Sequence, residues 1–260
     1  MRPTWKPVLA IAFSIVYAAS AVAEELVYAV TGVDDPLTEN ILAHVDSVQF
    51  GRQARLAEKD YPEVVAEAEA GAREALRPFG YYAADVTGRI ARRDAETLTL
   101  TLNVRKGPPM IVAEAHIDIV GDGARLGSLR TWRNKWPLVV GAVVDQGVWE
   151  QQKVSAIELA EADGYRAVQY TTQALELDLE SNRAVLRLTL DTGPRFVFGD
   201  VDYGDHVLKP GIIEYVPRFR KGGPYTTRLM DKFRVDLWKT GYFTTVEIQE
   251  TERTDVTPPQ

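Results

Sequence analysis

The residues that could carry out acid–base, nucleophilic or metal chemistry are few in this sequence. It contains no cysteine and only three histidines, His44, His116 and His206. Without cysteine, disulfide frameworks, thiolate zinc sites and cysteine nucleophiles are excluded. His116 and Asp118 share a strand face, but a pair two residues apart without a third ligand is a weak metal signal. We therefore expect no metal and no cofactor.

Nucleophile and phosphate-binding motifs are also missing. No Gly-x-Ser-x-Gly segment occurs, and the turn-forming Gly121-Asp122-Gly123 does not lead into a Lys-Ser or Lys-Thr phosphate site. The three histidines fall in different predicted units, where we expect satisfied surface or core side chains. The sequence therefore predicts that the chain is not an enzyme.

The charge balance argues against a nucleic-acid partner. The 260 residues include 30 Lys and Arg against 37 Asp and Glu, a net charge of −7, and no basic run is longer than two residues. Binding to a phosphate backbone requires clustered basic side chains. With 45% hydrophobic and 26% charged residues, the composition is that of an ordinary packed chain.

Residues 1–23 are predicted to be a secretory signal peptide. Two basic residues precede an apolar stretch at 8–17, and Ala21-Val22-Ala23 ends the segment. This order is typical of a cleavable signal, whereas a membrane-spanning helix needs about 20 apolar residues. We expect cleavage after Ala23 and export of the mature chain; the alternative is an uncleaved anchor.

A Gly-Tyr dipeptide recurs three times at similar spacing. Its copies are Gly80-Tyr81, Gly164-Tyr165 and Gly241-Tyr242, which lie 84 and 77 residues apart. Each copy ends a helical pattern and begins a stretch rich in Val, Thr, Tyr and Phe. A glycine after a helix adopts left-handed backbone without a Cβ clash, and the tyrosine can pack back on the helix end. We expect these six residues to be architectural.

Apolar residues at helical spacing precede each glycine. They are Val64, Ala68, Ala72 and Leu76 before Gly80; Trp149, Ala156, Ile157 and Ala160 before Gly164; and Leu229, Phe233 and Leu237 before Gly241. These stripes predict amphipathic helices, and Asp60 with Glu63 predicts a capping box at the first of them. Shorter helices are expected around residues 36–48, 124–132 and 210–215.

After the first two glycines the apolar period changes from 3.6 to 2. Leucines alternate with polar residues at 98–104 and again at 186–190, and turns at 93–95 and 180–182 join these strands to 82–92 and 165–179 as hairpins. Further strands are expected at 26–31, 111–120, 196–203 and 242–249. Gly107-Pro108 and Gly193-Pro194 follow the two hairpins. The repeating unit is β-α-α-β-β, an α+β arrangement.

This array resembles the POTRA (polypeptide-transport-associated) region of the BamA/TamA outer-membrane protein assembly family. The resemblance covers residues 24–250 and rests on the order of the units, the Gly-Tyr between second helix and second strand, and the Gly-Pro junctions. Three units resemble the TamA-like members more than the BamA-like ones. The resemblance implies an α+β tandem array of three units: POTRA 1 at 24–106, POTRA 2 at 107–193 and POTRA 3 at 194–250.

The third unit departs from the pattern. Counted from the glycine, its last strand would begin at 259–263, and residues 251–260 are polar without alternation. We therefore expect the third unit to be truncated, without its last strand and frayed beyond about Gly193. The tail at 251–260 is expected to lead to a β-barrel that is absent, so that the chain is an N-terminal fragment.

The resemblance also implies a function. Such arrays stand in the periplasm, attached to the outer membrane through the barrel of the full-length protein. They bind unfolded outer-membrane or autotransporter clients and link to a TamB-like, inner-membrane-anchored partner. The alternative is the POTRA region of a two-partner secretion transporter or of another exported scaffold, such as a cell-division protein.

Client binding is expected at the second strand of each unit, which lies at a sheet edge in the family. An edge strand offers unpaired N–H and C=O groups to any extended client. The expected client-binding residues are Asp85, Val86, Thr87, Arg89 and Ile90 in the first unit, and Val168, Gln169, Tyr170, Thr171 and Leu175 in the second.

Overall fold

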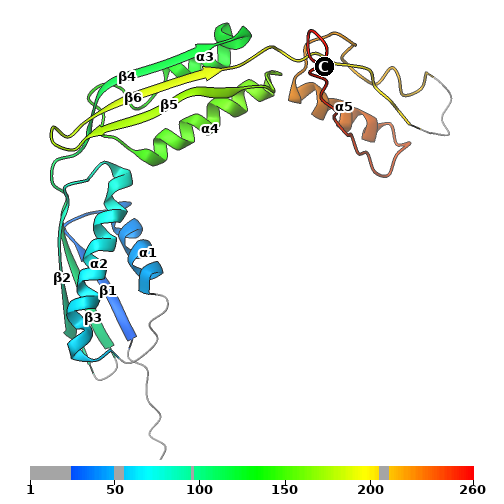
Figure 1. Cartoon of the computed structure of the whole chain (residues 1–260). Helices are drawn as coiled ribbons and strands as arrows, with labels where there is room; N and C mark the ends of the chain where they lie inside the picture. Colours follow the sequence, from blue (N-terminus) through cyan, green and yellow to red (C-terminus); the bar gives the residue numbers. More distant parts are fainter. Residues whose placement is uncertain (1–24, 50–55, 95–96, 205–210) are drawn as a thin grey trace, which may run out of the picture.

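The computed structural model describes residues 25–49, 56–94, 97–204 and 211–260. The expected signal peptide and His206 lie outside these residues. Figure 1 shows the described chain as successive bodies, which we call unit one, unit two and unit three in chain order. Within the described residues, no helix is both long and apolar enough to cross a bilayer.

Unit one has the predicted β-α-α-β-β order. Its elements are β1 (Glu25–Thr31), α1 (Leu37–Gln49), α2 (Tyr61–Leu76), β2 (Asp85–Arg92) and β3 (Thr97–Arg105). The sheet order is β1-β3-β2, with β3 parallel to β1 and antiparallel to β2. The last strand of the unit is therefore central, and the hairpin strand β2 lies at an edge, as predicted.

Unit two repeats this plan. Its elements are β4 (Ile111–Val120), α3 (Gly127–Asn134), α4 (Gln146–Ala162), β5 (Gln169–Asp178) and β6 (Arg183–Asp191). The sheet order is β4-β6-β5, with β6 parallel to β4 and antiparallel to β5. Short 3₁₀ turns complete the two units: η1 (Glu58–Asp60), η2 (Arg77–Phe79) and η3 (Asp122–Arg125).

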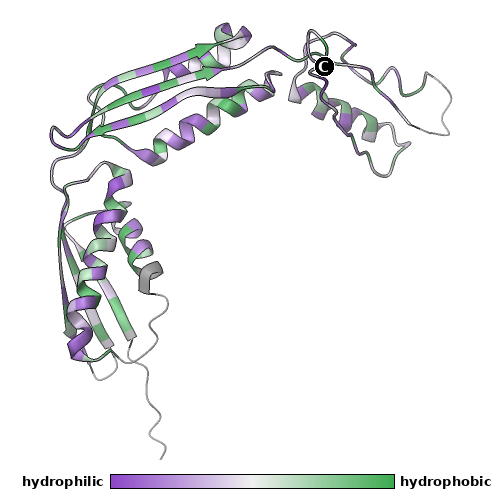
Figure 2. Ribbon diagram, viewed as in Figure 1, coloured by the Kyte–Doolittle hydropathy of each residue, from purple (hydrophilic) through white to green (hydrophobic). Residues whose placement is uncertain are grey.

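The alternating leucines of the central strands form the cores. Leu100 and Leu102 of β3 and Leu186 and Leu190 of β6 are fully buried, and their polar neighbours face the other side of each sheet. Helices pack on the apolar face: α1 and α2 lie side by side on the sheet of unit one (Figure 1). In Figure 2 polar and apolar residues interleave along α2 and α4, as expected for helices with one buried side.

The predicted capping box at Asp60 and Glu63 is wrong. Asp60 ends η1 with helical backbone angles (φ −91°, ψ −10°), and its side chain accepts no capping hydrogen bond. An N-cap normally has extended backbone, which lets its side chain reach the N–H groups of the first turn. Two later helices have this geometry: Asp145 accepts from Val148 N at 2.9 Å in α4, and the N-cap of α5 is formed in the same way.

Unit three contains a helix but no strand among its described residues. The helix α5 (Thr227–Lys239) confirms the third apolar stripe. The strands predicted at 196–203 and 242–249 are wrong, because only an isolated bridge at Val197 forms, and residues 211–215 form turns instead of the predicted helix. A strand requires a hydrogen-bonded neighbour. In units one and two the neighbour shared by the two outer strands is the central strand, and none of the described residues of unit three forms such a strand.

The tail at 251–260 folds back on unit three. Arg253 and Gln260 exchange backbone hydrogen bonds, at 2.6 Å from Arg253 N and 3.0 Å from Gln260 N. The carbonyl of Pro259 accepts a hydrogen bond from Val197 N at 2.9 Å. The polar tail is therefore packed beside residues 196–198.

Candidate functional site: sheet edges and unit junctions

The two edge strands differ in what their outer backbone groups contact. In β2 the backbone N–H of Gly88 donates to Glu69 Oε1 at 2.8 Å, and the carbonyl of Val86 accepts from Arg73 Nη2 at 2.9 Å. Because Gly88 N–H bonds to a helix side chain, residues 86, 88 and 90 direct their backbone groups away from β3. Two of the outer groups of β2 are thus already bonded by α2.

The predicted residues of β2 divide between the core and solvent. Val86 is buried and Ile90 half-buried, both facing α2, while Asp85, Thr87 and Arg89 are exposed. Asp85 pairs with Arg105 across the hairpin. The structure therefore places all five at the edge, with three side chains available to solvent.

The edge of β5 is shaped by a β-bulge. The pairing with β6 shifts between Tyr170 and Thr172, which leaves Thr171 as the extra residue. Tyr170 donates its hydroxyl to the carbonyl of Lys153 at 2.9 Å, and burial raises the pKa of its phenol. Beyond the bulge, residues 172–178 pair with β6 on one side only. Of the predicted residues, Val168 lies just before the strand and the other four lie within it.

The Gly-Tyr corners have the predicted geometry. Gly80, Gly164 and Gly241 all have positive φ, at 83°, 91° and 73°. The N–H groups of Tyr81 and Tyr165 reach back to the carbonyls of Leu76 and Ala160, at 3.2 and 3.0 Å. The helical segments before Gly80 and Gly164 therefore each end in a Schellman-type turn, in which the residue after the helix has a left-handed backbone conformation.

The first two corners also form the contacts between units. The carbonyl of Gly80 accepts from Met110 N, and that of Gly164 accepts from Phe196 N, both at 2.8 Å. A Cβ on Gly80 would lie 2.5 Å from the carbonyl oxygen of Val144, and a Cβ on Gly164 would lie 2.4 Å from that of Tyr225. Around Gly241 no atom of the described residues lies within 4 Å of the same point. Only the first two glycines are needed for close approach.

From the sequence, the links between units were predicted at Gly107-Pro108 and Gly193-Pro194, and these corner contacts were missed, although a signal for them exists. Gly141-Ala142-Val143-Val144 and Gly222-Gly223-Pro224-Tyr225 each stand directly before an N-cap residue, Asp145 or Thr226. Each segment forms an isolated β-bridge with a residue near the start of its unit, Val143 with Ile111 and Pro224 with Val197. These segments form a second repeat: a glycine is followed three residues later by an aromatic or β-branched residue, and the N-cap of a helix comes next. This repeat would have located the residues that contact Gly80 and Gly164.

Arg166 connects units two and three through a polar cluster. Its guanidinium lies 2.5 Å from Glu252 Oε1, 3.2 Å from Glu250 Oε2 and 3.3 Å from the hydroxyl of Tyr225. Tyr225 in turn donates to Glu250 at 2.9 Å. Burial, with this hydrogen bond, raises the pKa of Tyr225 to about 12, and the bond with Glu252 raises the pKa of Arg166.

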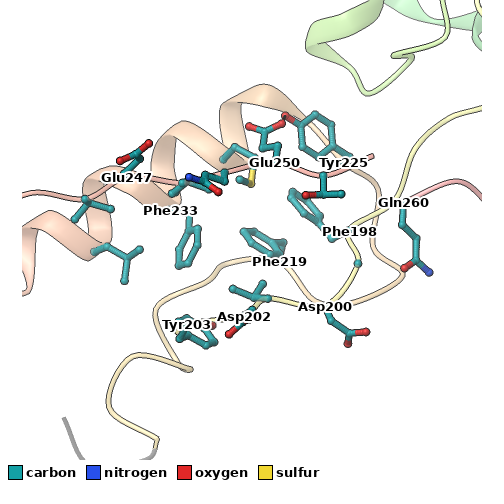
Figure 3. Close-up of a pocket in the computed structure, with 18 of the residues that line it drawn as sticks. Phe198, Asp200, Asp202, Tyr203, Phe219, Tyr225, Phe233, Glu247, Glu250 and Gln260 are labelled. Atoms are coloured by element: carbon teal, nitrogen blue, oxygen red, sulfur yellow. Dashed lines mark hydrogen bonds between the residues drawn. The ribbon is translucent and has the colours of Figure 1, made fainter. Parts of the chain in front are cut away.

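Unit three holds a cavity of about 790 Å³ (Figure 3). Residues 196–204 line one side and residues 245–252 another, with Phe198, Phe219 and Phe233 among its apolar walls. Phe198 and Phe219 stack with ring centroids 3.7 Å apart. The core of unit three is split into two clusters around this cavity, whereas that of unit two is continuous.

The two histidines that the structure describes, His44 and His116, lie in different units. His116 Nε2 lies 3.0 Å from Glu114 Oε2 on the same strand, and this hydrogen bond lowers the pKa of Glu114. Among the described residues, no group of three or more His, Asp or Glu is arranged to hold a metal ion.

Known proteins are similar to this chain in its first unit and, more distantly, along its length. Residues 27–106 match the family model described as POTRA domain, TamA domain 1. Among solved structures, BamA POTRA3–5 of Haemophilus influenzae is similar at 16% identity and a TM-score of 0.42, over 92% of both chains. The N-terminal domain of Omp85 from Thermosynechococcus elongatus is similar at 14% identity and a TM-score of 0.30, over 88% of both chains. POTRA1–3 of Omp85 from Anabaena is similar at 12% identity and 0.33, over 89% of this chain and 90% of that one.

The family model matches unit one, and unit two repeats its strand order, its Gly-Tyr corner and its junction glycine. Residues 27–106 are therefore similar to a POTRA domain of the TamA type.

Proposed function

We propose that this chain is a periplasmic scaffold that binds unfolded outer-membrane or autotransporter clients by β-augmentation, without catalysing a reaction. The observation that carries this proposal is the edge of β5, where residues 172–178 pair with β6 on one side only. An extended client can satisfy such an edge through its backbone whatever its sequence. That property suits a protein whose clients share strand-forming character and little else.

The remaining parts of the proposal follow from the family. We place the chain in the periplasm, attached to the outer membrane through the barrel of the full-length protein. A TamB-like, inner-membrane-anchored protein is its proposed partner. These assignments rest on the TamA-type model that matches residues 27–106.

The experiment replaces one backbone donor of the β5 edge. Gln173 stands opposite the buried Leu188 of β6, as Gly88 stands opposite the buried Leu102 of β3. Because the two pairs have equivalent positions, the N–H of Gln173 points away from β6, as that of Gly88 points away from β3. Proline at position 173 therefore removes this donor without removing a hydrogen bond between β5 and β6. We expect Gln173→Pro to reduce photo-crosslinking of a urea-unfolded outer-membrane barrel protein about fivefold, which is about 1 kcal/mol of binding.

Gln173→Ala is the matched control, because it removes the same exposed side chain and keeps the N–H. It should crosslink like the parent. Equal crosslinking of the proline variant and the parent, with an unchanged circular dichroism spectrum, would contradict β-augmentation at this edge.

A further inference from the structure

The outer edge of β2 contains a hydrogen-bonding position filled by an ion pair. Arg73 Nη2 donates to the carbonyl of Val86, and Glu69 Oε1 accepts from the N–H of Gly88. Between them, Arg73 Nη2 and Glu69 Oε2 lie 3.0 Å apart. One ion pair on α2 therefore occupies both backbone groups that flank Thr87.

These two groups are the ones that an added parallel strand would use. In a parallel ladder, a residue opposite position 87 donates its N–H to the carbonyl of 86 and accepts from the N–H of 88. Arg73 supplies the same donor, and Glu69 supplies the same acceptor. The ion pair thus takes the place of one residue of an added strand, with charge-assisted hydrogen bonds that are stronger than neutral ones.

The local sequence fits this arrangement. Glu69 and Arg73 are four residues apart on α2, with the acid first, which is the favourable order for a helical pair. A Cβ on Gly88 would lie 2.9 Å from Val65 Cγ1 and 3.5 Å from Glu69 Cγ. Glycine at this point of the strand therefore lets α2 come close enough for Glu69 to reach the backbone.

Unit two makes different contacts between its second helix and its edge strand. Lys153 Nζ bonds to the side chain of Gln173 at 3.3 Å, and the hydroxyl of Tyr170 bonds to the carbonyl of Lys153. Both contacts use side chains of β5 and not its backbone.

We propose that the Glu69–Arg73 pair closes the edge of β2 to added strands, so that β5 is the strand-docking edge of the resting molecule and β2 opens only when the pair is broken. The assignment of clients to these edges rests on the proposed function. The closure of β2 itself rests on the two backbone bonds of the ion pair.

The test uses the full chain, whose lack of cysteine allows a single photo-crosslinker to be attached at a chosen position. The label is placed on Thr87→Cys in one protein and on Thr172→Cys in another, and the probe is a urea-unfolded outer-membrane barrel protein. In the parent we expect crosslinking at 172 and little at 87. Glu69→Ala combined with Arg73→Ala should raise crosslinking at 87 about fivefold and leave 172 unchanged.

Glu74→Ala with Arg77→Ala is the matched control. This ion pair lies close by in the sequence, with Arg77 Nη1 2.9 Å from Glu74 Oε2, and it is not the pair that bonds to the backbone of β2. It should change neither label. Strong crosslinking at 87 in the parent, or no rise at 87 in the Glu69/Arg73 variant while 172 crosslinks, would overturn the proposal.

Hydrogen exchange separates this proposal from the proposed function. The amide of Gly88 should exchange about tenfold faster in the Glu69/Arg73 variant than in the parent or the control. If the exchange rate rises but neither position crosslinks in any protein, β-augmentation is wrong and closure of the edge stands. An unchanged exchange rate at Gly88 shows that the ion pair does not hold the edge.

Discussion

At the scale of single residues, the corner glycines differ in how much they depend on having no side chain. All three have a backbone conformation that L side chains rarely adopt. Gly80 and Gly164 also face a carbonyl oxygen of the next unit at a distance that no Cβ tolerates, whereas Gly241 faces open space. The same dipeptide therefore serves helix termination in three places and close packing between units in two.

This difference predicts the cost of alanine at each corner. Gly241→Ala should lower the free energy of unfolding by about 1 kcal/mol, the cost of the positive φ alone. Gly80→Ala and Gly164→Ala should lower it by about 2–4 kcal/mol, because the Cβ must also displace the backbone of the next unit. Urea unfolding followed by circular dichroism measures all three, and equal costs would show that the junctions yield without strain.

Tyr225 makes the attachment of unit three sensitive to alkali. Its pKa is raised to about 12 by burial and by Glu250, whereas an unfolded tyrosine titrates near 10. Because the folded pKa is the higher one, the neutral phenol stabilises the fold fully below about pH 10, and this contribution is lost as the pH rises through about 12.

When the pH is raised from about 9 to about 11.5, we therefore expect the free energy of unfolding to fall less in Tyr225→Phe than in the parent. Tyr215→Phe is the control, since Tyr215 is 86% exposed, and it should follow the parent. The measurement is urea unfolding at the two pH values. A parent and a Tyr225→Phe variant with the same loss would show that the phenol does not titrate with unfolding.

At the scale of elements, the spacing of apolar residues predicted the helices and strands whose formation depends on local sequence. The alternating leucines of β3 and β6 and the apolar stripes of α2, α4 and α5 were each recovered within a few residues. The contact of Glu69 and Arg73 with β2 could not be predicted, because it depends on where α2 crosses the sheet. Gly88 within a strand was the available hint, since an interior strand glycine often marks close approach.

The failed capping box at Asp60 has an energetic counterpart. Asp145 bonds to the N–H of Val148, so Asp145→Ala should cost about 1 kcal/mol of stability. Asp60 makes no such bond, and Asp60→Ala should remain within about 0.5 kcal/mol of the parent. Thermal or urea unfolding of the two variants decides this, and a larger cost at Asp60 would contradict the observed cap geometry.

At the scale of the whole molecule, the repeat explains both the regular units and the irregular one. In unit two, Ile111 N donates to the carbonyl of Asn182, the residue directly before β6. In unit three, Val197 N donates to the carbonyl of Pro259, and Val197 and Ile111 make equivalent bridges. Gln260 therefore occupies the position at which β6 begins in unit two, and it lies beside Gly199 and lines the cavity of unit three.

We propose that a parallel strand joined directly after Gln260 would fill this cavity and complete a third sheet. By the register of unit two, the first added residue and every second one after it should be apolar and face Phe198 and Phe233. A designed extension that copies residues 184–191 after Gln260 meets this pattern, because Ala184, Leu186 and the following alternate leucines face the core of unit two. Inserting one glycine before the copy provides the control, since a slip of one residue turns every side chain to the opposite face.

The expected result is slower amide exchange at residues 196–203 and 243–249, by about tenfold or more, in the in-register extension and not in the slipped one. The completed sheet should also join the two apolar clusters of unit three and raise its resistance to urea. Three strands with one buried face can be stable in water, whereas two strands alone are only marginally stable. If the two extensions protect these residues equally, then apolar side chains fill the cavity without forming a strand in the proposed register. Protection as strong in the unextended chain as along β3 would mean that unit three is stable without a central strand, and the register derived from Val197 and Pro259 would then be irrelevant to its stability.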